Sequence, residues 1–290
     1  MKILYIILYL SFLLTSSFSD SNKRIHNFKE IYTITAKPTI SKKRILKAIK
    51  YAELCSLTDK TNKQIKARYP HAIIHTTKIN EVKFFILIDN QHQTQTIAIR
   101  GSTTLKNWIQ DAKFFKVQDK WARNIQVHKG FYQTTRELYS KANKYLNPKY
   151  KTIITGHSLG GGVAILLGLY LEHFNFKKLD IITYGQPRIT NKNGAVILRN
   201  LRLERIVSQL DLVPSLPPKF LGFRHFGNSL ILTGGYLLRD YKTVESGEKD
   251  SKETLEIWDK LNNNIKVSKT DFQSHRIANY IKSLYNALEY

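Results

Sequence analysis

The chain has 290 residues, of which 42% are hydrophobic, so it is long enough to bury one substantial core. Its 46 Lys and Arg residues outnumber 22 Asp and Glu residues and give a formal net charge of +24, but they are scattered and no nucleic-acid-binding motif accompanies them, which argues against nucleic-acid recognition. The single cysteine excludes an internal disulfide, and without a Cys and His cluster at metal-ligand spacing or a phosphate-cradling loop the sequence predicts neither a metal nor an organic cofactor.

The positive charge leaves two interpretations open. A general compositional bias would produce a basic surface that contacts only water and ions, whereas attraction to anionic lipid would make the charge functional. We therefore expect peripheral contact with an anionic membrane as one alternative for a partner. The sequence does not predict an oligomeric state.

The first 19 residues have the features of a secretory signal peptide. Lys2 precedes an apolar run from Ile3 to Leu14, and Ser17 and Ser19 satisfy the rule for small residues before a cleavage site after Ser19. The run of about 12 apolar residues is shorter than the ~20 needed to span a bilayer. We therefore expect a signal peptide at 1–19, a single domain at 20–290 and secretion of the protein. The alternative is an uncleaved signal that anchors the protein in the membrane.

A helix and three strands are predicted next. Ser41 is a candidate N-cap for a helix that continues to Cys55, and the lone cysteine is expected to be buried. Residues 72–77, 82–89 and 94–100 have strand composition, with a polar turn before the last of them. The apolar face predicted for the helix consists of Ile45, Leu46, Ile49 and Ala52.

A short amphipathic segment follows Ser102 at the end of the third strand. Leu105, Trp108 and Ile109 are spaced at i, i+3 and i+4, so in a helix they share one face. An ordinary surface helix packed on the core is one interpretation of this pattern.

Helices and strands alternate through the middle of the chain. A helix is expected at 128–146, a strand at 150–155, and further core strands at 179–185 and 203–209. This alternation predicts an α/β domain with a mostly parallel sheet and crossover helices.

The motif Gly156-His157-Ser158-Leu159-Gly160 separates a β-branched run from an apolar helical pattern. In this strand-turn-helix setting, a G-x-S-x-G sequence is typical of a nucleophile elbow, in which the glycines allow strand and helix to approach closely. The turn would expose the Ser158 hydroxyl and direct the Leu159 amide toward it, while His157 would point away. The alternative is a tight glycine turn without chemistry.

A serine nucleophile needs a general base that a carboxylate holds in one tautomer, and α/β-hydrolases place these residues in the order Ser, Asp, His. Asp211 follows a predicted buried strand and precedes a proline-rich loop, which favours it as the carboxylate over Asp180, Asp240 and Asp271.

Two histidines follow Asp211 in the chain. His225 lies in a strand-like context that is typical of a structural group, whereas His275 lies where a loop enters the C-terminal helix and can approach the elbow. We favour His275 as the base.

These residues resemble the fungal-type triacylglycerol lipases, the class 3 lipase family of the α/β-hydrolase superfamily. Matching blocks run in family order from about residue 90 to 280, whereas the single cysteine and residues 236–269 depart from the family pattern. The blocks are Arg100-Gly101-Ser102, Asn107-Trp108 with Asp111, His128-x-Gly130-Phe131, Gly156-His157-Ser158-Leu159-Gly160-Gly161, Tyr184-Gly185-Gln186-Pro187-Arg188, Asp211-x-Val213-Pro214 with Leu216-Pro217, His225-x-Gly227 and His275.

The resemblance implies an α/β-hydrolase fold with a mostly parallel central sheet, flanking helices and a short helical lid. It implies a triad of Ser158, Asp211 and His275, oxyanion-hole amides at Ser102 and Leu159, and a structural role for His225. The residues that it assigns to the lid are Leu105, Trp108 and Ile109.

We therefore expect a secreted serine ester hydrolase that cleaves lipid carboxylic esters at a lipid–water interface through an acyl-enzyme. Phospholipase A1 or another carboxylesterase is the alternative with the same machinery. A catalytically silent lipid-binding protein is disfavoured because all three triad positions are filled.

Overall fold

The computed structural model of the protein describes residues 32–34, 40–102, 116–233, 237–243, 251–263 and 269–289. The predicted signal peptide at 1–19 and the predicted helix face of Leu105, Trp108 and Ile109 lie outside these residues. No helix within the described ranges is long and apolar enough to cross a membrane.

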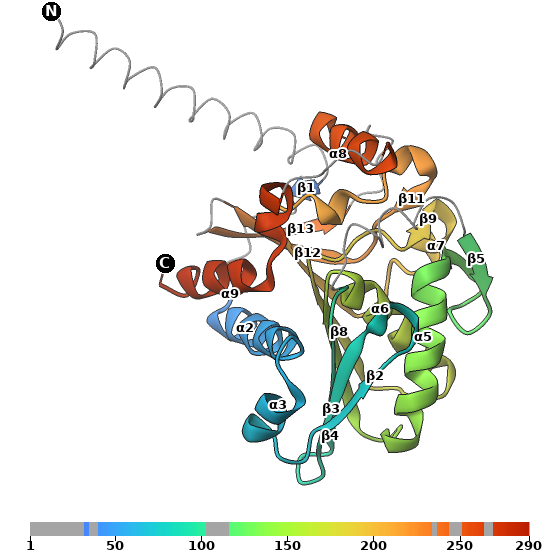
Figure 1. The fold of residues 1–290 in the computed structure, drawn as a ribbon, viewed down its shortest axis with the longest axis vertical. Coiled ribbons are helices and arrows are strands. Elements are labelled where there is room, and N and C mark those ends of the chain that lie inside the picture. Colours follow the sequence, from blue (N-terminus) through green and yellow to red (C-terminus); the bar gives the residue numbers. More distant parts are fainter. Residues whose placement is uncertain are drawn as a thin grey trace, which may run out of the picture.

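The described residues form helices and strands that alternate through much of the chain (Figure 1). The α-helices are α2 (Lys42–Leu57), α3 (Asn62–Arg68), α5 (Lys129–Ala142), α6 (Leu159–His173), α7 (Lys192–Ile197), α8 (Lys252–Asn262) and α9 (Ile277–Asn286). The strands are β1 (Tyr32–Ile34), β2 (Ile73–Thr76), β3 (Lys83–Asp89), β4 (Thr94–Ile99), β5 (Lys116–Asp119), β6 (Ile125–His128), β7 (Lys151–His157), β8 (Leu179–Tyr184), β9 (Thr190–Asn191), β10 (Leu203–Ser208), β11 (Phe223–Arg224), β12 (Asn228–Thr233) and β13 (Leu237–Thr243).

The main sheet has the order β1-β13-β12-β10-β8-β7-β4-β3-β2. Its centre, from β4 through β7, β8 and β10 to β12, is parallel, and both edges are antiparallel. Crossover helices such as α6 connect the parallel strands, which confirms the predicted parallel centre. The sequence analysis did not predict the small second sheet of β11, β9, β6 and β5.

Helices cover both faces of the main sheet, with α2 and α9 on one side and α5 and α6 on the other (Figure 1). Alternate residues of β3 therefore enter different cores: Phe84 packs with α5 and α6, and Phe85 packs with α2 and α9. Burial on both faces explains why the central strands read as nearly continuous apolar runs.

Helix α2 begins as predicted, because the Ser41 side chain accepts a hydrogen bond from the Arg44 amide. Cys55 is buried, as expected, and its Sγ lies 3.3 Å from Thr155 Oγ1 of β7. Burial raises the pKa of the Cys55 thiol to about 12, so it remains a neutral core group.

The prediction that Leu46 belongs to the buried face is wrong, because its side chain is 47% exposed. Leu46 is one residue, or about 100°, around the helix from the buried Ile45.

The parallel centre positions the predicted functional residues. Ser158 follows β7, Gly185 follows β8, and Asp211 comes shortly after β10. Since parallel neighbours end at the same edge of a sheet, these segments meet at its carboxyl-terminal edge.

Candidate active site

Ser158 lies in a sharp turn between β7 and α6. Its φ of 59° and ψ of −130° are rare for a residue with a side chain and cost roughly 1 to 3 kcal/mol, which the surroundings must offset. The turn is held by hydrogen bonds from the Ser158 amide to the Tyr184 carbonyl, at 2.9 Å, and from the Gly161 amide to the Ser158 carbonyl, at 2.9 Å.

Two glycines of the elbow have no room for a side chain. A Cβ at Gly156 would lie 2.2 Å from the Gly160 carbonyl oxygen, and a Cβ at Gly160 would lie 2.5 Å from the carbonyl oxygens of Ile99 and Arg100. The start of α6 thus packs directly on the ends of β4 and β7, as expected for a nucleophile elbow.

His275 and Asp211 form a buried pair, although 64 positions separate them in the chain. His275 Nδ1 lies 2.7 Å from Asp211 Oδ2, and the two residues are 6% and 3% exposed. A carboxylate can only accept hydrogen bonds, so Nδ1 carries the proton and Nε2 keeps its lone pair. This tautomer is the one that a general base requires.

Two further donors fix the Asp211 carboxylate. The Val213 amide donates to Oδ1 at 2.9 Å, and the Tyr280 hydroxyl donates to Oδ2 at 2.6 Å. The Ser208 amide donates in turn to the Tyr280 hydroxyl at 3.2 Å, so Tyr280 links the end of β10, the carboxylate and α9. Hydrogen bonds of this kind hold a carboxylate in one orientation.

Ser158 and His275 line one cavity of about 550 Å³, together with Gly101 and Ser102 from the loop after β4. Within the described part of the chain, His275 Nε2 has no hydrogen-bond partner. The hydrogen bond between base and nucleophile is often long in a free enzyme and shortens when substrate binds, so this arrangement suits the predicted roles.

The two predicted oxyanion donors come from opposite sides of the elbow. A Cβ at Gly101 would lie 2.9 Å from Ser158 Cβ, so the loop that carries Ser102 packs against the nucleophile. Leu159 is the first residue of α6, where backbone N–H groups have no partner within the helix and the helix dipole is positive. The Leu159 amide is therefore at the positive end of α6 beside Ser158, and the loop that carries Ser102 lies against the same residue.

His157 contributes to the site in a way that sequence reasoning missed. Its Nε2–H donates to the His275 carbonyl at 2.6 Å, and the two rings lie 4.5 Å apart with a tilt of 31°. Burial, followed by the nearby His275, lowers the pKa of His157 to about 3, so this ring is neutral at physiological pH. It supports the backbone and one side of His275 without adding charge.

Gly185 and Tyr280 were also given no role by sequence reasoning. Gly185 has a φ of +55°, and a Cβ there would lie 2.7 Å from Asp211 Oδ2 and 2.9 Å from His275 Nδ1. The sequence did contain one signal for Gly185, because this glycine is the last residue of a predicted core strand. Nothing local marks Tyr280, which reaches Asp211 only through the tertiary fold.

His225 is buried elsewhere, and its Nε2–H donates to the Pro214 carbonyl at 2.5 Å. Burial, with help from the nearby Arg205 and Arg188, lowers the pKa of His225 well below its usual value. The ring holds the loop that follows Asp211. The structure thus brings only one of the two candidate bases, His275, to the carboxylate.

The rejected candidate Asp180 lies near the start of β8, at the opposite edge of the sheet from Ser158. No group of three His, Cys, Asp or Glu side chains that could hold a metal ion occurs among the residues described.

The family model for class 3 lipases matches residues 96–221. The chain is 34% identical over 169 residues to secreted mono- and diacylglycerol lipase 1 of Fusarium solani, which covers 56% of this chain and 50% of that protein. It is 33% identical over 172 residues to a lipase of Rhizomucor miehei, which covers 54% of this chain and 47% of that protein. The chain spans about half the length of these curated relatives.

Among solved structures, the chain is similar to a triacylglycerol lipase whose catalytic centre is formed by a serine protease triad. The TM-score is 0.60 at 26% identity, and the match covers 72% of this chain and 89% of that one. This likeness and the parallel sheet centre confirm the predicted α/β-hydrolase fold.

Tyr280→Phe tests the support of Asp211. The substitution removes one donor from the carboxylate and leaves the Ser208 amide without its acceptor, so the free energy of unfolding should fall by about 1 to 3 kcal/mol. Tyr285→Phe is the matched control, because that hydroxyl donates to Glu53 at an exposed position and its loss should destabilise the protein much less. Urea denaturation measures both, and equal destabilisation would contradict the assignment.

Proposed function

We propose that the chain is a class 3 lipase, on the match of the family model to residues 96–221, and that it hydrolyses the carboxylic esters of lipids with Ser158 as nucleophile, His275 as general base and Asp211 as the carboxylate that orients the base. The observation that carries this proposal is the 2.7 Å contact between His275 Nδ1 and Asp211 Oδ2, beside the cavity that Ser158 and His275 both line. A lipid-binding protein without activity would not need this pair.

In the first half-reaction the Ser158 hydroxyl attacks the ester carbonyl, and His275 Nε2 takes the hydroxyl proton. The resulting oxyanion accepts hydrogen bonds from the Ser102 and Leu159 amides, and one such donor is worth about 10²- to 10³-fold in rate in a related mechanism. His275 then donates the proton to the departing alcohol. An acyl-enzyme remains on Ser158.

In the second half-reaction His275 takes a proton from water, and the water oxygen attacks the acyl carbonyl. When the tetrahedral intermediate collapses, the proton returns to Ser158 and a fatty acid is released. Because the Asp211 carboxylate accepts from Tyr280 and Val213 as well as from His275, it is held in the position from which it orients and stabilises the imidazolium.

An acylglycerol is the substrate class we propose, at a lipid–water interface. The Fusarium solani relative is named a secreted mono- and diacylglycerol lipase, which supports this substrate and also supports export through the predicted signal at 1–19. Phospholipase A1 activity uses the same machinery, and the net charge of +24 is the observation in its favour.

Substitution of the triad tests the roles. Ser158→Ala should lower kcat on a short-chain ester by about 10⁶-fold, and His275→Ala should match it. His225→Ala is the control for a buried histidine: it leaves the Pro214 carbonyl without a donor and should cost about 1 to 3 kcal/mol of stability, with activity per folded molecule retained. A folded His225→Ala protein without activity, beside an active His275→Ala protein, would refute the assignment.

We further propose that Leu105, Trp108 and Ile109 form the apolar face of a lid, on the spacing of the sequence, since these residues lie outside those the structure describes. Exposing the three side chains to water would cost at most roughly 5 to 8 kcal/mol, so the open form would be rare in water. A lipid surface offsets that cost, and a hinge next to Ser102 would couple opening to the oxyanion hole.

If this lid exists, the rate of hydrolysis of a short-chain ester should rise steeply when the ester concentration passes the solubility limit and an interface forms. Trp108→Ser should reduce this rise more than it changes hydrolysis of the dissolved ester. Initial rates measured across the solubility limit give the answer. A smooth saturation curve that Trp108→Ser leaves unaltered would show that this segment is no interfacial lid.

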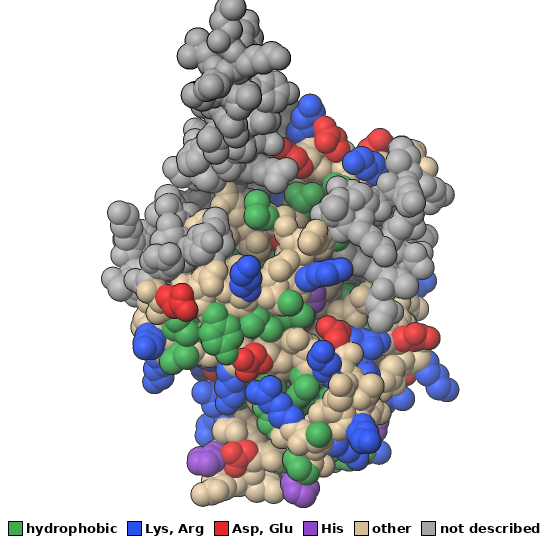
Figure 2. Space-filling view, turned by 60° about the vertical axis from the view of Figure 1, so that its left-hand side comes forward, with side chains coloured by type: hydrophobic (Ala, Val, Ile, Leu, Met, Phe, Trp, Pro, Cys, Tyr) green, Lys and Arg blue, Asp and Glu red, His purple; other side chains and the backbone are tan. Residues whose placement is uncertain are grey.

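Attraction to anionic membranes is the proposal that follows from the charge. Figure 2 shows Lys and Arg side chains distributed over one face of the molecule, with acidic and uncharged groups among them, so any attraction would be diffuse. Binding to vesicles should then strengthen with anionic lipid content and weaken as salt rises. Sedimentation with vesicles measures this, and equal binding to neutral and anionic vesicles at low salt would leave compositional bias as the explanation.

A further inference from the structure

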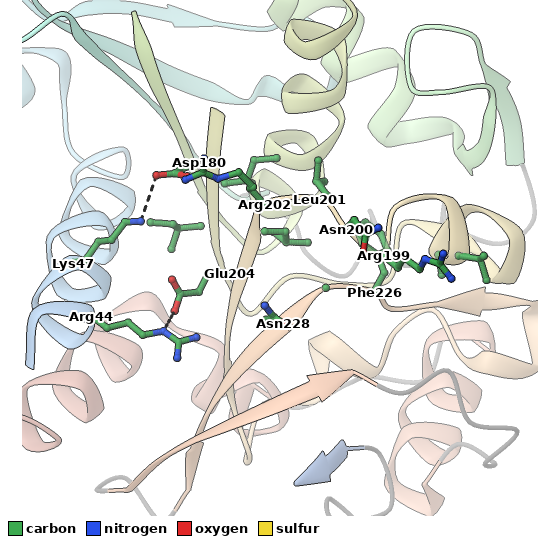
Figure 3. Close-up of a pocket in the computed structure, with 16 residues that line it drawn as sticks. Arg44, Lys47, Asp180, Arg199, Asn200, Leu201, Arg202, Glu204, Phe226 and Asn228 are labelled. Carbon is green, nitrogen blue, oxygen red and sulfur yellow. Dashed lines mark hydrogen bonds and ion pairs between the residues drawn. The ribbon is translucent and has the colours of Figure 1, made fainter. Parts of the chain in front are cut away.

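A second concavity, of about 770 Å³, lies at the opposite edge of the main sheet from Ser158 (Figure 3). It spans the amino-terminal ends of β8, β10 and β12, marked by Asp180, Glu204 and Asn228, and extends from α2 to the segment that follows α7. We call it the amino-edge groove. Its volume falls in the range of small-molecule sites.

The charges of the groove are unbalanced around Asp180. This carboxylate, only 11% exposed, faces Arg202 Nη2 at 2.7 Å, Lys47 Nζ at 3.5 Å and Lys151 Nζ at 3.6 Å. Lys151 lies outside the groove lining, so within the lining Asp180 meets two positive charges, Arg202 and Lys47, and one of them is uncompensated. Arg44 is paired with Glu204 at 2.6 Å and adds no excess.

Further positive charge comes from the other side of the groove. Arg199 follows α7 and has no ion-pair partner among the residues that the structure describes. Arg202 and Lys47 are exposed by 72% and 40%, and ion pairs at such positions contribute only about 0 to 1 kcal/mol. These side chains can therefore turn toward an anion at little cost.

Apolar side chains lie between the charged ones. The 47% exposed Val196 and the half-buried Leu201 give the lining accessible apolar surface, whereas Ile181, Ile182 and Phe226 are buried and offer little to a ligand. A ligand that fits both parts of the lining carries an anionic head and an apolar body.

We propose that the amino-edge groove binds a single amphiphile with a phosphate monoester head. A phosphate monoester carries about −1.5 to −2 charges near neutral pH, which matches the two uncompensated charges of the lining, one beside Asp180 and one on Arg199, and guanidinium groups suit its oxygens. We infer a dissolved ligand and not a bilayer, and this part of the proposal rests on the proposed function. A lipid surface that delivers an ester to Ser158 would contact the carboxyl-terminal edge of the sheet, whereas the groove lies at the amino-terminal edge.

Binding of octyl phosphate below its micelle concentration tests the proposal by isothermal titration calorimetry. The protein carries Ser158→Ala, so the result is independent of turnover, and ionic strength is held constant. Inorganic phosphate and octyl glucoside, which each keep one half of the ligand, should bind at least about tenfold more weakly than octyl phosphate. Equal binding of either one would overturn the proposal.

The double variant Lys47→Gln/Arg202→Gln should weaken octyl phosphate binding by about tenfold or more, because two charge-assisted hydrogen bonds are lost. Asp180 keeps Lys151 as a partner in this variant. Arg199→Gln breaks no ion pair among the described residues, so it should leave the fold intact and still weaken octyl phosphate binding. Weaker binding in this variant could then not be attributed to a folding defect.

The matched control is Lys63→Gln/Lys66→Gln, which removes two exposed charges from α3, outside the groove. It should bind octyl phosphate like the parent protein, whereas equal losses in the control and the groove variants would overturn the proposal in favour of net charge. Vesicles of phosphatidylcholine with phosphatidic acid should bind the groove variant and the control equally. A loss confined to the groove variant would identify a bilayer, not a dissolved ligand, as the occupant.

Discussion

Close packing of α6 on the ends of β4 and β7 is the constraint on which the site depends. Gly160 contacts the backbone after Ile99, and Gly156 contacts the first turn of α6, so neither position can carry a Cβ. This contact forces Ser158 into a left-handed φ and brings the loop at Gly101 against it. The same packing thus positions the nucleophile, the first amide of a helix and the loop with Ser102.

His275 and Asp211, the proposed base and its carboxylate, are held by other elements than those that hold Ser158. Asp211 follows β10, while His275 and Tyr280 come from the segment that ends in α9, and the Tyr280 hydroxyl joins the two through Asp211 Oδ2. On the other side, the His157 ring lies against His275 and binds its carbonyl. Because burial keeps His157 neutral, it adds no positive charge beside a base that becomes cationic during the proposed reaction.

The sheet separates two chemically different edges. Its carboxyl-terminal edge presents Ser158, Asp211 and a cavity lined by His157 and His275, whereas its amino-terminal edge presents the cations around Asp180. Strands β8 and β10 connect the two, since Asp180 and Glu204 lie near their starts and Gly185 and Asp211 follow their ends. The cations around Asp180 are therefore remote from the proposed chemistry.

The sequence predicted the features that a contiguous motif, an apolar run or the order of residues along the chain reveals. The elbow is a contiguous motif, and the apolar runs of β3, β4, β7 and β8 reflect burial on both faces. The order of Ser, Asp and His pointed to Asp211 and His275, which the structure brings into contact. Their catalytic roles stay a prediction.

Other features depend on contacts between distant segments and have no local signature. Tyr280 looks like one more aromatic residue of an amphipathic helix until the fold brings it to Asp211, and His157 acquires its role only from the position of His275. The short strands β9 and β11 have too few residues to show a period. Leu46 was misplaced because an apolar residue at the margin of a helix face can be left in water.

Labelling with a fluorophosphonate tests the central claim most directly, because such a probe reacts only with a serine that a base activates. The account predicts one probe per molecule, mapped to Ser158 by peptide mass spectrometry, with no labelling of Ser158→Ala and greatly slowed labelling of His275→Ala. Detergent micelles should be present to offer the interface that a lid would require. An unreactive Ser158 in the folded protein, or stoichiometric labelling of a different serine, would contradict it.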